Sequence, residues 1–346
     1  MSVNDGIVDL RSDTVTRPTP EMRRAMAEAE VGDDAYREDP TVRRLESLSA
    51  GLLGMEAGLY VPSGTMANQV ALRVLARPGT EVLCGERAHV YRYEHAAAAL
   101  NAGVQLRPLA DADGHLRADH VTRALKGPEH HLPDVSAVFL ENTHMPACGR
   151  PLRIEEIGAV IAVSRAANVA VHCDGARLWN AAIALATAPS ALVEGCDTAM
   201  FCLSKGLSAP VGSVLCGSRV VIDDARVQRS RLGGGMRQAG VIASAGIVAL
   251  ETMVERLADD HARARQLADA LADAFPGSVD PASVETNIVC AAAAAFPTDL
   301  LDALAADGVH AGTIDVDTVR FVTHNDIDDA GLDRAIASLR RIAARS

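Results

Sequence analysis

The fold of this 346-residue chain is decided by the stretch Val169-Ala170-Val171-His172-Cys173-Asp174-Gly175-Ala176-Arg177. A short apolar run reaches an acidic residue there, which is typical of a buried parallel strand that ends where open α/β sheets bind their ligands. A second apolar run, 199–203, follows about one β-α-β unit later and is followed by Ser204 and Lys205. Because such strands end at the same edge of a sheet, we expect Asp174 and Lys205 to lie on neighbouring strand ends.

Outward from this stretch, short apolar runs alternate with segments of helical period from about residue 41 to residue 217. The alternation predicts an α/β fold with a parallel sheet that is covered on both faces. The candidate strands are 59–61, 81–84, 104–108, 137–140, 169–172, 199–203 and 213–216, and the candidate helices between them include 65–75, 154–167 and 180–186.

The C-terminal part has a different pattern. Residues 241–275 are rich in alanine and leucine and predict one or two long helices. After Pro276 we expect strands at 287–292 and 318–322, and helices at 298–307 and from residue 328 onward. The chain therefore divides near residue 250 into a large domain with the N-terminal segment, 1–250, and a small α+β domain, 251–346.

Composition argues against several classes of partner. Lysine and arginine total 33 against 45 for aspartate and glutamate, and only 3% of residues are aromatic, so nucleic acid would be repelled and poorly stacked. No apolar run approaches the roughly 18 residues of a membrane helix, and the N-terminal residues lack a secretory pattern, so we expect a cytoplasmic protein without membrane contact. The seven cysteines include no C-x-x-C pair, which favours reduced thiols over a disulfide frame or a zinc cluster, and we expect no metal.

The motifs of several common enzyme classes do not occur in the sequence. It contains no G-x-G-x-x-G, no G-x-x-x-x-G-K-[ST], no H-E-x-x-H and no G-x-S-x-G. Dinucleotide-binding, P-loop, zinc-protease and serine-hydrolase interpretations therefore lose their usual support.

A candidate anion site lies in the segment LYVPSGTMAN at 59–68. It predicts a strand, a turn of small residues and the start of a helix, so that Ser63, Gly64 and Thr65 would present backbone N–H groups and the positive end of a helix to a phosphate. The alternative is a plain helix cap, in which Ser63 or Thr65 only satisfies the free backbone donors.

The two strand-end residues have alternative interpretations of their own. Asp174 could simply cap the helix that follows it, and Lys205 could extend its side chain to solvent. A lysine at a desolvated strand end, however, has a lowered pKa and becomes a nucleophilic amine that can form an imine. Together, a phosphate cup, a buried aspartate and a strand-end lysine in this order match the requirements of pyridoxal phosphate.

His89, which follows the candidate strand 81–84, is a further candidate. Its imidazole could lie flat on the cofactor's ring. A structural role is the alternative, and we favour the stacking role at this position.

These residues and several flanking segments resemble the L-threonine aldolase family, of the low-specificity type. The matching segments are VDLRSDTVTRP at 8–18, VGDDAY at 31–36, ENTH at 141–144, HCDGAR at 172–177, LSKGL at 203–207 and GGGMRQ at 233–238. The resemblance implies the aspartate-aminotransferase-like fold (fold type I of pyridoxal-phosphate enzymes): a three-layer large domain with a mostly parallel seven-stranded sheet and a small α+β C-terminal domain. It also implies a homotetramer built as a dimer of dimers, with active sites shared across each dimer.

The activity implied by the resemblance is the pyridoxal 5'-phosphate-dependent cleavage of L-threonine, L-allo-threonine and other L-β-hydroxy-α-amino acids to glycine and an aldehyde. Lys205 matches the lysine that binds the cofactor's aldehyde, Asp174 the partner of the pyridine nitrogen, and His89 the stacking ring. The other matching cofactor positions are Ser63, Gly64, Thr65, Arg177, Ser204 and Arg237, the last of them donated by the neighbouring subunit.

The resemblance also assigns the substrate's contacts. The matching positions are Ser12, Arg177 and Arg320 at the carboxylate, His144 near the hydroxyl, and Tyr36 and Tyr93 lining the pocket from across the dimer interface. A guanidinium fork is a natural partner for a carboxylate. Either His89 or His144 is the candidate that assists removal of the hydroxyl proton, directly or through water.

Two segments depart from the family pattern. Residues 145–150, MPACGR, replace the usual asparagine and paired glycines after ENTH, and Arg37 follows Tyr36 where small or acidic residues are more familiar. These departures leave the preferred stereochemistry and side chain of the substrate open. The alternatives are a β-eliminating lyase of the same fold, against which LRSDTVT and the ENTH histidine argue, and a catalytically silent pyridoxal-phosphate protein, which would tolerate loss of the carboxylate arginines.

Overall fold

A seven-stranded sheet forms the centre of the computed structural model, which describes residues 6–125 and 131–345. Its strands are β2 Ala57–Val61, β3 Glu81–Gly85, β4 Gln105–Leu109, β5 Val135–Glu141, β6 Ala170–Gly175, β7 Thr198–Cys202 and β8 Ser213–Gly217. Their order is β2-β8-β7-β6-β5-β3-β4, and β8 runs antiparallel to its neighbours while the other pairs are parallel. Each of the seven predicted strands is present, so the expected mostly parallel sheet is confirmed.

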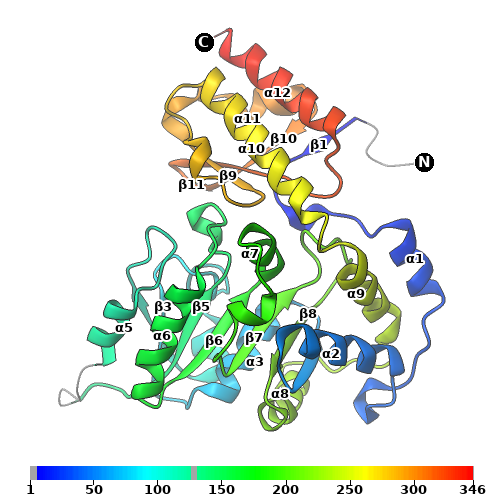
Figure 1. The fold of residues 1–346 in the computed structure, drawn as a ribbon, viewed down its shortest axis with the longest axis vertical. Helices are drawn as coiled ribbons and strands as arrows, with labels where there is room; N and C mark the ends of the chain where they lie inside the picture. The colour runs from blue at the N-terminus through cyan, green and yellow to red at the C-terminus, as the bar shows by residue number, and fades with distance from the viewer. Residues whose placement is uncertain (1–5, 126–130, 346) are drawn as a thin grey trace.

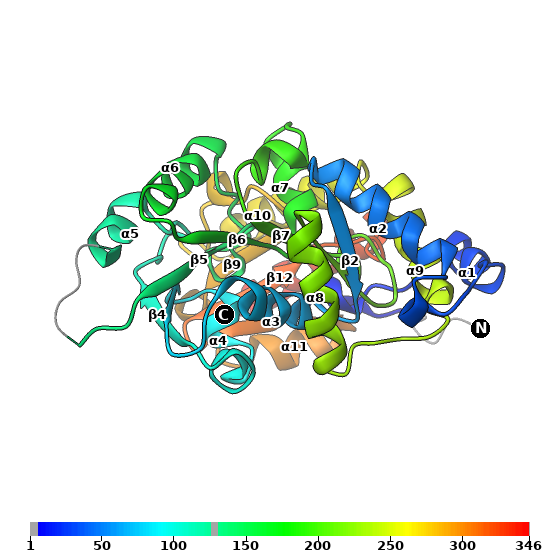
Figure 2. The ribbon, with the colours of Figure 1, turned by 90° about the horizontal axis from the view of Figure 1, so that it is seen from below.

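Helices cover both faces of this sheet (Figures 1 and 2). The helices of the large unit are α1 Pro20–Ala27, α2 Pro40–Leu53, α3 Gly64–Leu75, α4 His89–Arg92, α5 Ala118–Leu125, α6 Ile154–Ala166, α7 Leu178–Ala184, α8 Arg219–Arg231 and α9 Gly240–Thr252. In Figure 2, α3 and α8 lie on one side of the sheet and α6 and α7 on the other.

The alternation of side chains along β2 explains the three layers. Leu59 and Val61 are buried in one apolar cluster with Val70 of α3, whereas Tyr60 is buried in a second cluster with Val160 of α6. Successive residues of a strand point to opposite faces, so a strand that is apolar throughout needs helices on both sides. No helix among the described residues is long and apolar enough to cross a membrane.

The C-terminal part forms a smaller unit above the large sheet in Figure 1. Its elements are α10 Leu257–Ala274, β9 Ile288–Ala292, α11 Leu300–Ala306, β10 Val309–His310, β11 Gly312–Asp315, β12 Thr318–Val322 and α12 Asp329–Ala343. The strands β11, β12 and β9 form an antiparallel sheet. The segment 241–275 is two helices, α9 and α10, although residues 253–256 between them include no glycine or proline that would predict a break.

The N-terminal strand β1, Val8–Asp9, pairs in parallel with β10 of the smaller unit. Val8 and Leu10 are buried in the same apolar cluster as Leu267 of α10 and Leu339 of α12. The division at residue 250 stays a proposal, and these contacts favour counting the first strand with the smaller unit.

The connection between β7 and β8 carries Lys205 and ends in a tight turn at Gly212. Gly212 has a φ of +108°, and a Cβ atom there would lie 2.4 Å from Cε2 of Tyr60. Only glycine satisfies both the left-handed backbone and the close approach to the ring. The turn therefore fixes how the Lys205 segment returns beside β2.

We expect Gly212→Ala to lower the free energy of unfolding by about 2–5 kcal/mol, because backbone strain and overlap with Tyr60 act together. Denaturant unfolding of the purified protein measures the change. Gly79→Ala is the matched control, since Gly79 has a φ of +81° and open space around its Cα, and it should cost only about 1–2 kcal/mol of backbone strain. Equal losses in the two variants would show that Tyr60 does not constrain the turn.

Candidate active site

A cavity of about 220 Å³ lies where β6 and β7 end. Its lining includes seven of the predicted cofactor-binding residues, Ser63, Gly64, Thr65, His89, Asp174, Ser204 and Lys205, together with Asn68, which the sequence analysis missed. Asp174 is paired in the sheet with Met200 of β7, so that the strand end and the Lys205 segment meet at one edge, as the sequence predicts. Lys205 borders the cavity and is not fully exposed to solvent.

The N-terminus of α3 forms one wall of the cavity. Ser63 Oγ accepts a hydrogen bond of 3.1 Å from the backbone N–H of Met66, so the cap that we considered as an alternative is present. A Cβ atom at Gly64 would lie 2.8 Å from Cys202 Sγ. Glycine therefore allows the helix to begin directly against the end of β7, where its positive end faces the cavity. Capping and anion binding are compatible here, because the Ser63 hydroxyl keeps its own proton to donate.

Asp174 is almost fully buried and accepts two hydrogen bonds. Asn68 Nδ2 donates to Oδ2 at 2.7 Å, and the backbone N–H of Ala176 donates to Oδ1 at 3.0 Å. Asp174 is not the cap of the next helix, since α7 begins at Leu178 and its N-cap residue is Arg177. Its carboxylate is held in the cavity wall by side-chain and backbone donors that stabilise a negative charge.

Asn68 is oriented by a neutral histidine. His172 Nε2 lies 3.1 Å from Asn68 Oδ1, and His172 Nδ1 lies 2.8 Å from Thr198 Oγ1. Burial lowers the pKa of His172 to about 4, so the ring is uncharged near neutral pH. The neutral ring donates from Nε2 and accepts at Nδ1, which directs the Asn68 amide nitrogen toward Asp174.

A buried glutamate, Glu94, supports His89. His89 Nδ1 lies 2.9 Å from Glu94 Oε1, and Glu94 also accepts hydrogen bonds from Asn68 Nδ2 at 2.8 Å and Gln69 Nε2 at 2.7 Å. One ring nitrogen of His89 and one carboxylate oxygen each of Glu94 and Asp174 lie within 4.8 Å of one another. Burial opposes a charge on His89, but the hydrogen bond to Glu94 and the charges of Asp174, Glu94 and Glu141 outweigh it and raise the pKa of His89.

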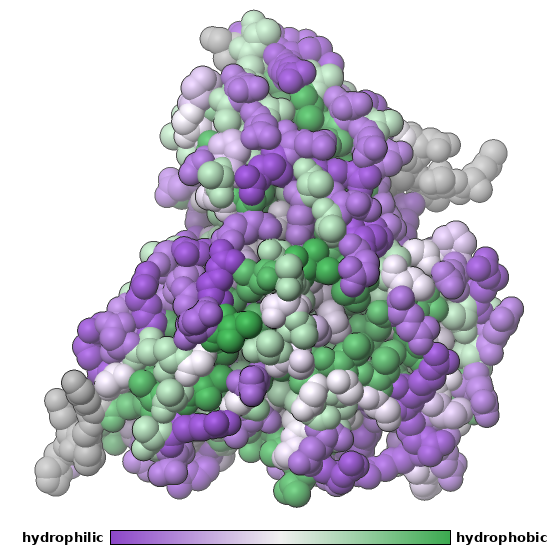
Figure 3. All heavy atoms as spheres, in the orientation of Figure 1, coloured by the Kyte–Doolittle hydropathy of each residue, from purple (hydrophilic) through white to green (hydrophobic). Residues whose placement is uncertain are grey.

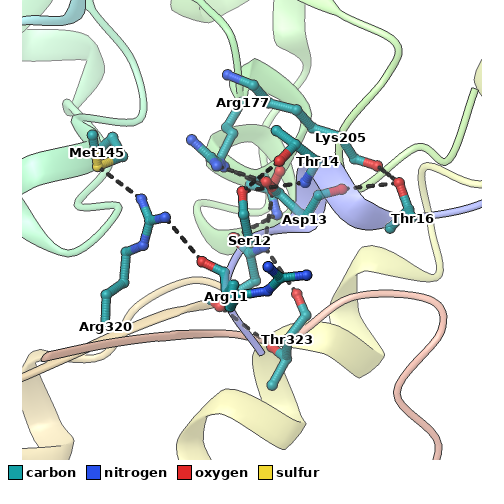
Figure 4. Close-up of polar contacts among 12 residues, drawn as sticks. Arg11, Ser12, Asp13, Thr14, Thr16, Met145, Arg177, Lys205, Arg320 and Thr323 are labelled. Carbon is teal, nitrogen blue, oxygen red and sulfur yellow. Dashed lines mark hydrogen bonds and ion pairs between the residues drawn. The ribbon is translucent and has the colours of Figure 1, made fainter. Parts of the chain in front are cut away.

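Arg177 does not point to open space but forms a buried pair with Asp13 (Figure 4). Its Nε and Nη2 donate to the two carboxylate oxygens at 2.8 and 2.6 Å, and Asn287 Nδ2 also donates to Asp13 at 3.2 Å. Burial alone would raise the pKa of Asp13, but the charges of Arg177 and Lys205 hold it well below its usual range. Asp13 belongs to the quoted LRSDTVT segment, yet its role was not predicted.

Arg320 lies close to this pair and is incompletely bonded. Its Nη2 donates to the backbone oxygen of Arg11 at 2.9 Å, and Nη1 lies 3.3 Å from Met145 Sδ, while Nε is buried without a hydrogen-bond partner (Figure 4). Burial and the charge of Arg177 lower the pKa of Arg320. A buried N–H without a partner, next to a second guanidinium, makes Arg320 a candidate donor to an anionic group.

His144 is buried away from the cavity lining. Its Nε2 lies 2.7 Å from Asp111 Oδ2, and its Nδ1 accepts from the backbone N–H of Ala147 at 3.2 Å. Burial opposes a charge on His144, but the charge of Glu141 and the hydrogen bond and charge of Asp111 raise its pKa. Both ring nitrogens are therefore engaged within the chain.

The remaining predicted residues are Tyr93, Ser12, Arg237 and Tyr36, and they differ in their contacts and exposure within a single chain. The ring of Tyr93 lies 5.6 Å from that of His89, and Ser12 Oγ is bonded to the backbone N–H of Thr14 at 3.2 Å. Arg237 and Tyr36 are 70% and 76% exposed, and Arg237 pairs only weakly with Asp33 at 3.6 Å. Neither Arg237 nor Tyr36 is among the described residues that line the cavity of this chain.

The chain is similar to several known proteins. The family model described as beta-eliminating lyase matches residues 9–294. Low-specificity L-threonine aldolase 1 of Arabidopsis thaliana is 43% identical over 286 residues, which cover 82% of this chain and 80% of the relative. The low specificity L-threonine aldolase of Escherichia coli K12 is 39% identical over 341 residues, 98% of this chain and 100% of the relative. The solved threonine aldolase of Leishmania major superposes with a TM-score of 0.85 at 17% identity, covering 97% of this chain and 99% of that one, and so shares the fold.

We expect Glu94→Gln to lower the pKa of His89, because the amide cannot provide the negative charge that stabilises the imidazolium. Histidine-labelled protein followed by NMR over a pH series measures this pKa directly. Glu86→Gln is the matched control, since Glu86 is an exposed glutamate of the same segment. A pKa of His89 that is unchanged in Glu94→Gln would contradict the assigned contact.

Proposed function

We propose, from the premise that the chain belongs to the beta-eliminating lyase family, that it is a pyridoxal 5'-phosphate-dependent L-threonine aldolase. Its reaction is the cleavage of L-threonine, L-allo-threonine and other L-β-hydroxy-α-amino acids to glycine and an aldehyde. The observation that carries the proposal is the meeting of Asp174, Lys205 and the N-terminus of α3 around one cavity. The similarity to low-specificity L-threonine aldolases over nearly the whole chain supports the substrate class.

The residues present fit the cofactor. Lys205 offers an amine for its aldehyde, Asp174 a carboxylate for its pyridine nitrogen, and the start of α3 an anion site for its phosphate. The other phosphate-binding candidates are Ser63, Gly64, Thr65 and Ser204, which line the same cavity. When bound, pyridoxal phosphate supplies an electron sink that stabilises the electron pair left on Cα when the Cα–Cβ bond breaks.

Asp174 would hold a proton on the pyridine nitrogen. Its two donors, Asn68 and the backbone N–H of Ala176, fix the orientation of the carboxylate. The ring of His89, fixed through Nδ1 by Glu94, would stack on the cofactor's ring. The Asn68 amide joins these two supports, since it donates to both carboxylates.

The carboxylate of the amino acid would bind to Arg320 and Arg177, with Ser12 beside them. Arg320 Nε has no hydrogen-bond partner in this structure, and the positive charges of Arg177 and Lys205 lie close to Asp13. Such a clamp orients the Cα–Cβ bond as well as adding affinity, and so it selects the bond that breaks.

The geometry favours His89 over His144 as the group that accepts the proton of the β-hydroxyl. His89 borders the cavity and contacts Glu94 through Nδ1, so Nε2 is the nitrogen that we propose for the substrate's proton. Both nitrogens of His144 are occupied by Asp111 and Ala147. His144 would then act by positioning the loop beside the substrate.

The assembly that we propose is a homotetramer made of two dimers that share active sites, in the cytoplasm. The exposure of Arg237 and Tyr36 in the single chain supports donation of both to a neighbour. Figure 3 shows hydrophobic residues gathered over the large unit around α7 and α9, whereas the same face of the smaller unit is mainly hydrophilic. The hydrophobic area supports self-association through the large unit.

Product analysis tests the proposed activity. Protein loaded with pyridoxal phosphate should convert L-threonine to glycine and acetaldehyde in equal amounts. A β-eliminating lyase would instead release 2-oxobutanoate and ammonia from the same substrate. The absence of all four products, with the cofactor bound, would favour a catalytically silent pyridoxal-phosphate protein.

We expect Lys205→Ala to lose the absorbance band of the bound cofactor and at least about 10³-fold of the turnover, because the covalent anchor is removed. Absorption spectroscopy and an acetaldehyde assay measure the two effects. Lys126→Ala is the control, since Lys126 is the other of the two lysines in the sequence, and it should keep both properties. Turnover near that of the unchanged protein in Lys205→Ala would refute the assignment.

Mixing two inactive variants tests the shared site. Lys205→Ala and Arg237→Ala are each expected to be inactive, but a mixed dimer holds one site with both original residues. Random exchange at equal amounts should restore about a quarter of the original activity. If mass measurement confirms subunit exchange and no activity returns, Arg237 acts within its own chain.

A further inference from the structure

Two cysteines from different units of the fold lie next to the site. Cys148 follows the 3-10 turn Met145–Ala147, in the loop after β5 that carries His144. Cys290 lies at the centre of β9 in the smaller sheet. Both are partly buried, and both are free thiols.

The loop packs against one face of β9. A Cβ atom at Gly149 would lie 3.2 Å from Cδ1 of Ile288, and Thr286 Oγ1 donates to the backbone oxygen of Gly149 at 2.8 Å. Because side chains two apart on a strand share a face, Cys290 points to the same side as Ile288. The thiol of Cys290 is therefore directed toward the loop of Cys148.

Arg320 provides a second contact between the smaller sheet and the loop of Cys148. Arg320 of β12 is paired directly with Cys290 in the antiparallel register, so their side chains share a face. Arg320 Nη1 contacts Met145 Sδ at 3.3 Å (Figure 4). The loop therefore contacts the sheet at Met145, before Cys148, and at Gly149, after it. The side chains of Cys148 and Cys290 interact with each other.

We propose that Cys148 and Cys290 form a modification site, which a peroxide converts to a disulfide between the loop after β5 and the smaller sheet. The bond would join parts of the chain that only non-covalent contacts hold together in the reduced state. It would also lie beside Arg320, the candidate partner of the substrate's carboxylate.

The chemistry balances with hydrogen peroxide as the oxidant. The Cys148 thiolate attacks one peroxide oxygen, the O–O bond breaks, and the hydroxide that leaves takes up a proton to become water. The Cys290 sulfur then attacks the sulfenic sulfur of Cys148, an S–S bond forms, and a second water leaves with the Cys290 proton. The two thiols together lose two electrons, which reduce the peroxide.

The order of attack follows from the acidity of the two thiols. The interaction with Cys290 lowers the pKa of Cys148 against the effect of burial, with help from the charge of Arg87. The same interaction, together with burial, raises the pKa of Cys290. These directions fit an order in which Cys148 attacks the peroxide and Cys290 resolves the intermediate, and the same disulfide and two waters result if the two roles are exchanged.

The disulfide should weaken substrate binding, a consequence that rests on the proposed function. Arg320 must release Met145 to turn fully toward a carboxylate. A bond between Cys148 and Cys290 would hold β9, and with it the paired strand β12 of Arg320, against the Met145 loop. We therefore expect a higher KM for L-threonine in the oxidised protein, with recovery after treatment with dithiothreitol.

Peptide mapping tests the site independently of aldolase activity. After stoichiometric hydrogen peroxide and alkylation, the expected product is a cross-linked peptide pair with Cys148 and Cys290, lighter by two hydrogen atoms and absent after dithiothreitol. The melting temperature of the oxidised protein should rise, because the closed loop restricts the unfolded chain. Cys148→Ser and Cys290→Ser should each abolish the cross-link and the rise, whereas the control Cys196→Ser should keep both.

Two outcomes would overturn the proposed disulfide, and a third would overturn its effect on substrate binding. One is oxidation of Cys148 to a sulfinic acid without a cross-link, and another is a cross-link that persists in Cys148→Ser. The third, a disulfide with an unchanged KM, would leave a stabilising bond and contradict its effect on substrate binding. If the reduced protein has no aldolase activity, the result counts against the proposed function and not against the disulfide. The cross-link and the melting temperature can be measured without that activity.

Discussion

The parallel pairing of β6 with β7 is the constraint on which the rest of the site depends. It aligns Asp174 with Met200, so that the end of one strand and the lysine segment after the next strand meet at one edge of the sheet. Both strands are buried, and neither can shift by one residue without turning its apolar side chains to the wrong layer. The close start of α3 at Gly64 and the turn at Gly212 then complete the cavity around a fixed pair of groups.

Each buried carboxylate described at this site is hydrogen-bonded to donors inside the protein. Asp13 neutralises Arg177 through two hydrogen bonds, and Glu94 and Asp174 share the amide of Asn68. Burial makes an unpaired charge expensive, so each carboxylate has several donors. Arg320 differs, since its buried Nε has no hydrogen-bond partner, and this is the observation on which its proposed contact with the substrate's carboxylate rests.

The sequence predicts the strands, the α3 turn and the pair of Asp174 and Lys205, because each depends on a local pattern at the end of an apolar run. It does not predict Glu94 or Asn68, whose importance arises from contacts with residues far along the chain. The short strands β1 and β10 were missed because a two-residue pairing leaves no periodic pattern. Arg237 and Tyr36 are exposed and lie outside the described lining of the cavity, which is why we propose that a neighbouring chain uses them.

Lys205 as the covalent anchor of the cofactor is the central claim, and borohydride reduction tests it most directly. Reduction makes a lysine–cofactor bond permanent, and the chain has two lysines, Lys126 and Lys205, of which Lys126 lies outside the described residues. After loading with pyridoxal phosphate, reduction and digestion, mass spectrometry should find the cofactor's added mass on the peptide that contains Lys205. A label on Lys126, or on neither lysine, would contradict the account.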